Sequence, residues 1–327
     1  MIVRESEIID RLRRFATAPE ARGLLDDVAL LDGLVITHDT IAEGVHFLSS
    51  DPPPSVGWKL VAVNLSDLAA KGATPAGALL SLTMSGPSQW ALDFLGGVEA
   101  ACESYGMPLI GGDTIALPEG APRVLGLTAI GRAGERVPAR AGGKAGDRLW
   151  LVGTVGDAAA GLAQLKDDRH AAGPLVDIYR RPVPLLKPGQ ALAPEAHAMM
   201  DVSDGLLLDA NRMAEASGCG MVIDLDALPL SRAFIAERSN SLQARLSAAT
   251  GGDDYALLAA LAPDIEPSTL SLPEGTTIAC IGSLHAGPPS IRLMYGGTPV
   301  ELPERLGFEH SDDQHRGLSA PPVADRP

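Results

Sequence analysis

Residues 64–73 (NLSDLAAKGA) constrain the fold most, because they place a carboxylate inside an otherwise apolar pattern. The pattern predicts the second half of a helix that begins near Trp58 and stops at Gly72. At 3.6 residues per turn, Asp67 and Lys71 lie on one face of this helix, and leucine and alanine cover the rest. An ionised carboxylate is costly to bury unless a charged group meets it. We therefore expect charged groups from elsewhere in the chain to gather around Asp67.

Four other short segments also concentrate aspartates. They are residues 26–27, 38–40, 111–114 and 201–205. Many carboxylates in one cleft could not all stay ionised without cations between them. We interpret the acids as ligands of hard divalent cations that hold a nucleotide triphosphate. Magnesium fits best, because it prefers oxygen ligands and is commonly shared between carboxylates and phosphates.

Each segment taken singly also has an ordinary structural explanation. The pair at 26–27 is typical of a turn, as are the glycines at 111–114, and Asp204 is typical of the N-cap of a helix that starts at Leu206. A lone histidine such as His46 is more often a satisfied core residue than a ligand. Only the combination of segments favours a metal site.

Charge and cysteine content exclude several classes of protein. A formal net charge of −15 and a pI near 4.8 argue against a nucleic-acid partner. Three scattered cysteines without a CxxC pair fit a reducing cytoplasm and neither a disulfide framework nor a zinc site. The charged N-terminus lacks the apolar core of a secretory signal, and hydroxyl residues and prolines interrupt the uncharged run 72–92. We expect a soluble, cytoplasmic protein with no membrane partner.

The length of 327 residues predicts two domains of ordinary size. A segment rich in Gly, Ala and Arg at 134–146 marks their boundary. We expect an N-terminal ATP- and magnesium-binding domain over 1–136, a C-terminal α/β domain over 137–310, and a disordered tail over 311–327. Each domain is predicted to be an α+β layer, with helices on one face of a mixed sheet.

Three predicted strands deliver acids at their ends: 34–37 before 38–40, a short buried strand at 107–110 before 111–114, and 199–202 before 203–205. Open α/β sheets bind ligands at such ends. Residues 179–184 are predicted to be an extended connection. The chain has no GxxxxGK[ST] motif, so a P-loop is excluded, and it shows no Ser–His–Asp arrangement. Phosphoryl transfer, which needs mainly positioning and charge neutralisation, suits a site of this composition.

Five motifs occur in a fixed order: DTIAEGVHF at 39–47, AVNLSDLAA at 62–70, LIGGDT at 109–114, VSDGL at 202–206 and GGDDY at 251–255. Together they resemble the thiamine-monophosphate kinase family of the aminoimidazole-ribonucleotide-synthetase-like superfamily, over roughly residues 8–310. The resemblance implies the two-domain fold of that superfamily. It also implies a homodimer formed through the N-terminal sheets, and ATP held by several Mg²⁺ ions.

Carried over motif by motif, the resemblance implies three sets of site residues. The metal positions are Asp27, Thr37, His38, Asp39, Asp67, Asp113, Asp201 and Asp204, of which Asp67, Asp113, Asp201 and Asp204 act in catalysis through the metal. The ATP contacts are Gly112, Asp113, Arg140, Ser203 and Tyr105. The positions that face thiamine phosphate are His46, Asp253 and Phe308, the last by stacking on a cationic ring.

The implied reaction converts ATP and thiamine monophosphate into ADP and thiamine diphosphate. The attacking phosphate has a second pKa of about 6 and is largely ionised at neutral pH. We therefore expect direct in-line transfer without a protein base or a covalent intermediate. Two alternatives stay open, another ATP-using enzyme of the superfamily and a non-catalytic protein that binds magnesium and nucleotide.

Four positions depart from the family pattern. Leu25 stands where a glycine usually precedes the Asp–Asp pair, and His38 replaces a small hydroxyl residue. Asp253 is one methylene shorter than the usual glutamate, and Leu185 replaces an arginine. None of these changes removes a carboxylate of the predicted metal site.

Overall fold

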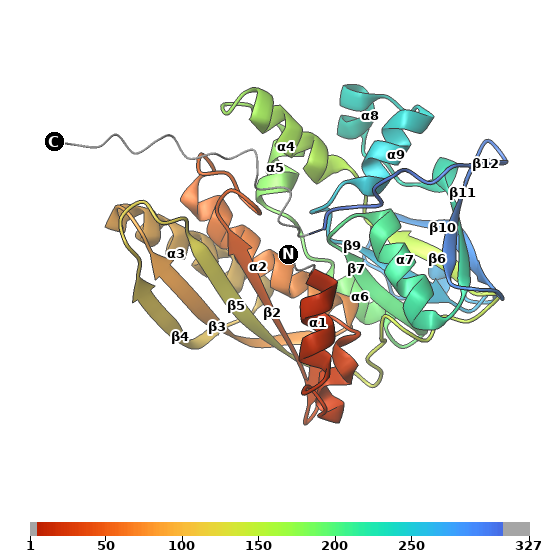
Figure 1. The fold of residues 1–327 in the computed structure, drawn as a ribbon, viewed down its shortest axis with the longest axis horizontal. Helices are drawn as coiled ribbons and strands as arrows, with labels where there is room; N and C mark the ends of the chain where they lie inside the picture. The colour runs from red at the N-terminus through yellow and green to blue at the C-terminus, as the bar shows by residue number, and fades with distance from the viewer. Residues whose placement is uncertain (1–4, 310–327) are drawn as a thin grey trace.

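The computed structural model describes residues 5–309, which form two β-sheets with helices packed between and beside them (Figure 1). The predicted tail at 311–327 lies outside the described residues. The first sheet contains, in spatial order, β1 (Ala29–Leu31), β2 (Leu34–Ala42), β5 (Val124–Arg132), β3 (Thr74–Met84) and β4 (Leu109–Ala116). The second contains β12 (Thr298–Val300), β11 (Ser290–Tyr295), β8 (Gly220–Asp224), β10 (Ile278–His285), β6 (Arg148–Val152), β9 (Ala256–Leu261) and β7 (Ala196–Val202). Both sheets mix parallel and antiparallel pairs, which confirms the predicted fold class.

The helices belong to two groups along the chain. The first group is α1 (Glu5–Arg13), α2 (Pro53–Ala70) and α3 (Ser88–Tyr105). The second is α4 (Asp157–Asp167), α5 (Pro174–Arg180), α6 (Leu186–Leu192), α7 (Leu206–Ser217), α8 (Arg232–Arg238) and α9 (Leu242–Thr250). The prediction of an extended connection at 179–184 was wrong at its start, because Tyr179 and Arg180 end α5.

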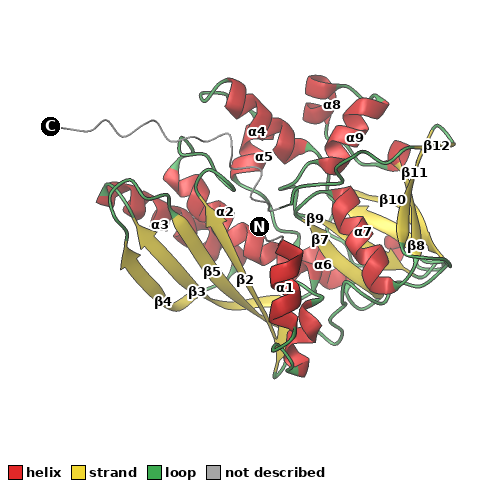
Figure 2. Ribbon diagram, in the orientation of Figure 1, coloured by secondary structure: helices red, strands yellow, loops and turns green. Residues whose placement is uncertain are grey.

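Helix α2 lies between the two sheets (Figure 2). It begins at Pro53, earlier than the predicted start near Trp58, because proline is well tolerated at the first helical position. Its crossing with α3 is close: a Cβ on Gly57 would lie 2.2 Å from the main-chain oxygen of Phe94. Since α2 contacts α3, the first sheet, α5, α6 and β7, nearly all of its side chains beyond Val56 are buried.

Two strands, β2 and β4, continue past their predicted C-terminal ends. β2 runs through residues 38–40, which were expected beyond its end, because all its residues pair with β5. β4 contains residues 111–114, which were expected to follow a buried strand at 107–110. The expectation of burial was also wrong: β4 is an edge strand, and every one of its residues is exposed.

The second sheet is covered on both faces. One face packs against α7 and α9 through a hydrophobic core of its own. Side chains on the other face, including Trp150, Met199 and Leu257, join the core that surrounds α2. The end of β7 is thereby held next to α2, and the aspartates of these two elements face each other.

Candidate active site

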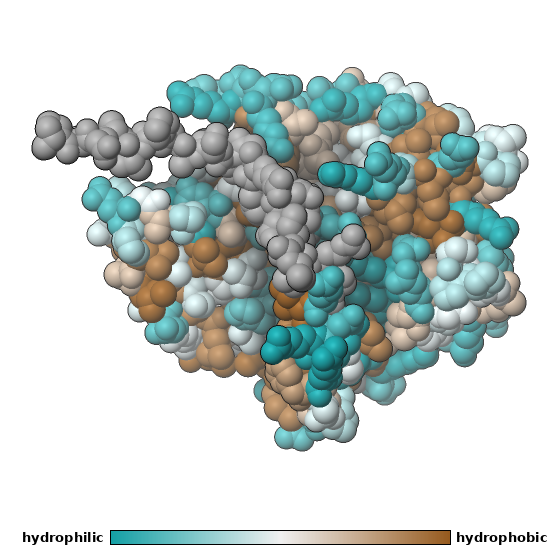
Figure 3. All heavy atoms as spheres, viewed as in Figure 1, coloured by the Kyte–Doolittle hydropathy of each residue, from teal (hydrophilic) through white to brown (hydrophobic). Residues whose placement is uncertain are grey.

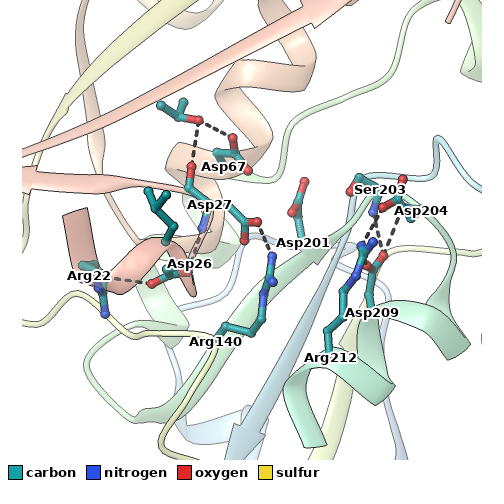
Figure 4. A network of polar contacts seen from close by, with 12 residues as sticks. Arg22, Asp26, Asp27, Asp67, Arg140, Asp201, Ser203, Asp204, Asp209 and Arg212 are labelled. Carbon is teal, nitrogen blue, oxygen red and sulfur yellow. Dashed lines mark hydrogen bonds and ion pairs between the residues drawn. The ribbon is translucent and has the colours of Figure 1, made fainter. Parts of the chain in front are cut away.

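Three carboxylates meet where α2 passes between the sheets (Figure 4). Asp67 comes from α2, Asp27 from the loop before β1, and Asp201 from β7. One oxygen of each lies within 4.8 Å of the other two. Thr37 donates a hydrogen bond to the Asp67 carboxylate, and Ser66 Oγ donates to Asp201 Oδ2 at 2.7 Å. The structure thus brings together acids that the sequence predicted would converge.

Asp39, on β2, stands beside this group. Side chains alternate between the faces of a strand, so Thr37 and Asp39 point towards α2. The backbone N–H of Asp39 donates to Asn64 Oδ1 on α2 at 3.0 Å. Part of β2 is therefore fixed against the helix that carries Asp67.

Burial and mutual repulsion raise the pKa values of these acids. The pKa of Asp67 is raised well above its usual value by burial and then by Asp39, Asp201 and Asp27. Burial, followed by the charge of Asp27, raises the pKa of Asp201 to about 8. Burial, Asp27 and Asp204 raise the pKa of Asp39 to about 6. Full ionisation of such a group requires positive charge among the carboxylates.

The donor atoms fit a hard divalent cation. The clustered ligands are carboxylate oxygens, which magnesium and calcium prefer. Asp27 Oδ2 is buried without a hydrogen-bond partner in the part of the chain that the structure describes, while Asp27 Oδ1 pairs with Arg140. A buried polar atom left in this state is costly. A cation bound beside Asp27 would give Oδ2 the partner that it lacks among the described residues.

A second charged cluster lies on the turn between β7 and α7. The Asp209 carboxylate accepts the backbone N–H groups of Ser203 and Asp204, each at 3.1 Å. Arg212 pairs with Asp204 at 2.6 Å and with Asp209 at 2.9 Å. Asp204 is not the N-cap of α7, because Gly205 holds that position. Sequence analysis did not identify Asp209 and Arg212 as site residues, although both lie on one face of the helix predicted from Leu206.

Lys71, on the same face of α2 as Asp67, ends in a fully buried ion pair. Its Nζ lies 2.6 Å from Asp26 Oδ1 and donates to the main-chain oxygen of Met199 at 3.2 Å. Asp26 Oδ1 also accepts the N–H of Asp27 at 3.1 Å. Lys71 therefore ties the loop that carries Asp27 to both α2 and β7.

Two residues expected to face thiamine phosphate lie against the β7–α7 turn. The N–H of Asp253 donates to the main-chain oxygen of Ser203, and the N–H of Phe308 donates to that of Asp204, both at 2.8 Å. Segments far apart in the sequence thus meet beside the acids. The third residue, His46, reaches the same region from the N-terminal domain through Lys59.

Lys59 is a buried cation that the sequence reading missed. Its Nζ donates to the main-chain oxygen of His46 at 2.9 Å and pairs with Asp253 Oδ2 at 2.8 Å. The signal that could have revealed it is the one that drew attention to Asp67: a charged residue in an apolar helix.

Within one chain, Asp113 and Gly112 lie apart from the cluster of Asp27, Asp67 and Asp201. Asp113 is in register with Ser81 on β3, an exposed residue between buried Leu80 and Leu82. The side chain of Asp113 therefore lies on the sheet face that points away from α2. Gly112 is needed for close strand pairing, since a Cβ there would lie 2.0 Å from the main-chain oxygen of Leu80.

His38 and Tyr105 also have partners outside the acid group. His38 Nδ1 lies 2.9 Å from Thr128 Oγ1, on the face of the first sheet away from α2. Tyr105 packs edge-on against Trp58, with ring centroids 5.7 Å apart. The His38 side chain is thus turned away from the carboxylates that it was expected to join.

Among the described residues, no helix has both the length and the apolar character needed to cross a membrane.

Comparison with known proteins identifies the family to which this chain is related. The models for AIR synthase related protein match at residues 25–133 for the N-terminal domain and 144–284 for the C-terminal domain. Thiamine-monophosphate kinase of Salmonella typhimurium is 37% identical over 315 residues, 92% of this chain and 95% of the relative. The protein of that name from Caulobacter vibrioides is 38% identical over 323 residues, 94% of this chain and 90% of the relative.

A solved structure, AaThiL complexed with AMPPCP and TMP, superposes with a TM-score of 0.81 at 30% identity, covering 94% of this chain and 97% of the other. Both AIR synthase related domains are therefore present, and the likeness to AaThiL extends over nearly the whole chain. The chain belongs to the thiamine-monophosphate kinase family of AIR synthase related proteins.

Proposed function

We propose that this chain transfers the γ-phosphoryl group of ATP to thiamine monophosphate, forming ADP and thiamine diphosphate. The observation that carries the proposal is the meeting of Asp27, Asp67 and Asp201, drawn from both domains, in a member of this family. The curated relatives are named for this kinase, and AaThiL is described in complex with AMPPCP and TMP. The domain limits proposed are 1–136 and 137–310.

In this proposal Asp27, Asp67 and Asp201 hold Mg²⁺, with Asp39 and Asp204 close by. Bound magnesium would neutralise the two phosphates that must approach each other. Thr37 and Ser66 orient their carboxylate partners through hydrogen bonds that need no rearrangement. The protein thus contributes fixed geometry more than chemical reactivity.

Three further groups act on the substrates in this scheme. Arg140, paired with Asp27 in the structure, can turn to a phosphate oxygen once a cation satisfies that carboxylate. Ser203 presents its hydroxyl from a turn that Asp209 holds by its main chain. The N–H of Ala42 donates to His46 Nδ1 at 3.1 Å, so a neutral His46 carries its proton on Nε2 as a donor.

We also propose a homodimer formed through the first sheets. Its support is an apolar face that no helix among residues 5–309 covers, where Leu79, Ile115 and Val124 are each exposed by two-fifths or more. Figure 3 shows hydrophobic side chains over this sheet, at the lower left of the view. Asp113 lies on the same face, so dimerisation would place it between subunits. A cytoplasmic location belongs to the proposal too, because the three cysteines are unpaired.

Phe308→Ala tests the substrate side of the site. Loss of an aromatic face that stacks on the cationic ring should raise the KM for thiamine monophosphate about five- to tenfold, and leave the KM for ATP within twofold. Steady-state kinetics with each substrate varied in turn would measure this. Phe15→Ala, which removes an exposed phenylalanine, is the matched control. Equal increases in both constants would contradict the role of Phe308.

The function itself is tested by turnover. Purified protein with magnesium and ATP would receive thiamine, thiamine monophosphate or an aminoimidazole precursor in parallel, with ADP and thiamine diphosphate as readouts. Product is expected from thiamine monophosphate alone. Phosphorylation of thiamine would point to a different kinase, and nucleotide binding without any product would favour a non-catalytic protein.

A further inference from the structure

Lys59 lies deep between the domains at a point that no step of the proposed reaction uses. It is 2% exposed, yet it joins α2 to segments from both domains. Its Nζ contacts the main-chain oxygen of His46 and Asp253 Oδ2, and it stands 4.1 Å from the centre of the Tyr179 ring. A cation this deeply buried cannot contact a substrate, so it acts through its partners.

Asp253 is the partner that such a cation can control. Its φ of +70° is in the left-handed region, and that of Tyr255 is +52°. Non-glycine residues held in this region carry strain that the surroundings must offset, a condition found often at ligand sites. Tyr255 Oη donates to Asp253 Oδ1 at 3.0 Å, while Lys59 holds Oδ2. The Asp253 side chain is still a quarter exposed, and the backbone hydrogen bond from Asp253 to Ser203 places this residue beside the β7–α7 turn.

We propose that Lys59 is a positioning residue for thiamine monophosphate, which fixes the Asp253 carboxylate and the His46 loop at a set separation across the domain boundary. This inference rests on the proposed function and assigns Lys59 to the half of the substrate that carries the amine and the cationic ring. Asp253 supplies negative charge and acceptor oxygens there, and His46 supplies a ring donor. Lys59 fixes the direction of the Asp253 carboxylate and the position of the His46 loop.

The effect should be confined to one substrate. ATP is expected at the acids and Arg140. Among the residues that the structure describes, Lys59 bonds only to the two positions that face thiamine phosphate, and it packs on Tyr179. Lys59→Met keeps an unbranched side chain as far as Cε and removes the terminal ammonium group with its charge and donors. Asp253 then loses its buried counter-charge and is free to leave its strained conformation. We expect the KM for thiamine monophosphate to rise about tenfold, with the KM for ATP within twofold.

A double-mutant cycle separates positioning from general stability. If Lys59 acts through Asp253, adding Lys59→Met to Asp253→Asn should change the KM for thiamine monophosphate by less than twofold beyond Asp253→Asn alone. Lys59→Arg, which can still pair with Asp253, should recover part of the loss. Lys166→Met, at an exposed position on α4, is the control and should match the wild type.

Melting temperatures identify any variant that fails to fold. Removing one partner of a buried pair is more destabilising than neutralising both, so the double variant should melt above Lys59→Met and keep the cycle measurable. Independent, multiplicative effects of the two changes, or equal rises in both KM values, would overturn the inference while leaving the kinase intact. A wild-type protein with no turnover of thiamine monophosphate would overturn the proposed function itself.

Discussion

Asp67→Asn is expected to lower kcat by at least about a hundredfold while the protein stays folded. The change removes one of three negative charges that surround the proposed cation. An asparagine oxygen can still accept the hydrogen bond from Thr37, so we expect the local structure to be retained. Initial rates of thiamine diphosphate formation, with circular dichroism as a check on folding, would measure the effect.

The same variant should be more stable than the wild type when metal is absent. Burial and neighbouring acids raise the pKa of Asp67, so its ionisation opposes folding increasingly as the pH rises. Asparagine has no charge to bury, and its melting temperature in EDTA at pH 8 should equal or exceed that of the wild type. Asp93→Asn, at an exposed position on α3, is the matched control for both measurements. Wild-type turnover in Asp67→Asn would remove this residue from the site.

Metal-free protein should lose stability as the pH rises from about 5.5 to 8.5, and magnesium should restore it. The pKa of Asp39 is raised to about 6 and that of Asp201 to about 8, from an ordinary value of 3.8. A carboxyl with a raised folded pKa contributes stability that is complete below the unfolded value and is lost as the pH passes the folded value. The melting temperature in EDTA should therefore fall by about 5 °C or more across this range.

In the proposed site magnesium binds the ionised acids, so its stabilising effect should be larger at pH 8.5 than at pH 5.5. Asp201→Asn isolates the contribution of the cluster from other groups that titrate, and it should flatten both dependences. Thermal melts at fixed ionic strength, with and without the same concentration of magnesium at both pH values, would measure this. A magnesium effect that is the same at both pH values would contradict the assignment of these acids.

Local sequence patterns predicted the elements that carry the acids. The helical spacing around Asp67 is unambiguous, and the short, mostly apolar run 199–202, which contains Asp201, was predicted to be a strand and forms the end of β7. The convergence of these acids could be expected because buried carboxylates stay ionised only with positive charge among them, and cations shared between the carboxylates supply it. The order of the five motifs then added the family, which the comparisons confirmed.

Sequence patterns could not show how far a strand extends once it has a partner. β2 and β4 run through segments that were expected to follow these strands, because pairing with β5 and β3 continues past the apolar residues. This difference moves the side chains of His38 and Asp113 to the sheet face away from the acids. Alternation along a strand decides such placements, and it depends on register rather than composition.

Sequence patterns also could not predict which charged residues pair with each other. Lys71 lies on the predicted face of α2, yet it pairs with Asp26 rather than Asp67, and this ion pair holds the Asp26 loop against the helix. Lys59 meets Asp253 only after both domains have packed on α2. Both contacts depend on long-range packing that no local pattern encodes.

The central claim is that aspartates from both domains bind one divalent cation beside the phosphates. Anomalous diffraction from crystals grown with Mn²⁺ and AMPPCP tests it most directly. We predict a manganese peak about 2 Å from a carboxylate oxygen of Asp27, of Asp67 and of Asp201. Manganese bound only to phosphate or to surface acids, with these three carboxylates unliganded, would contradict the account.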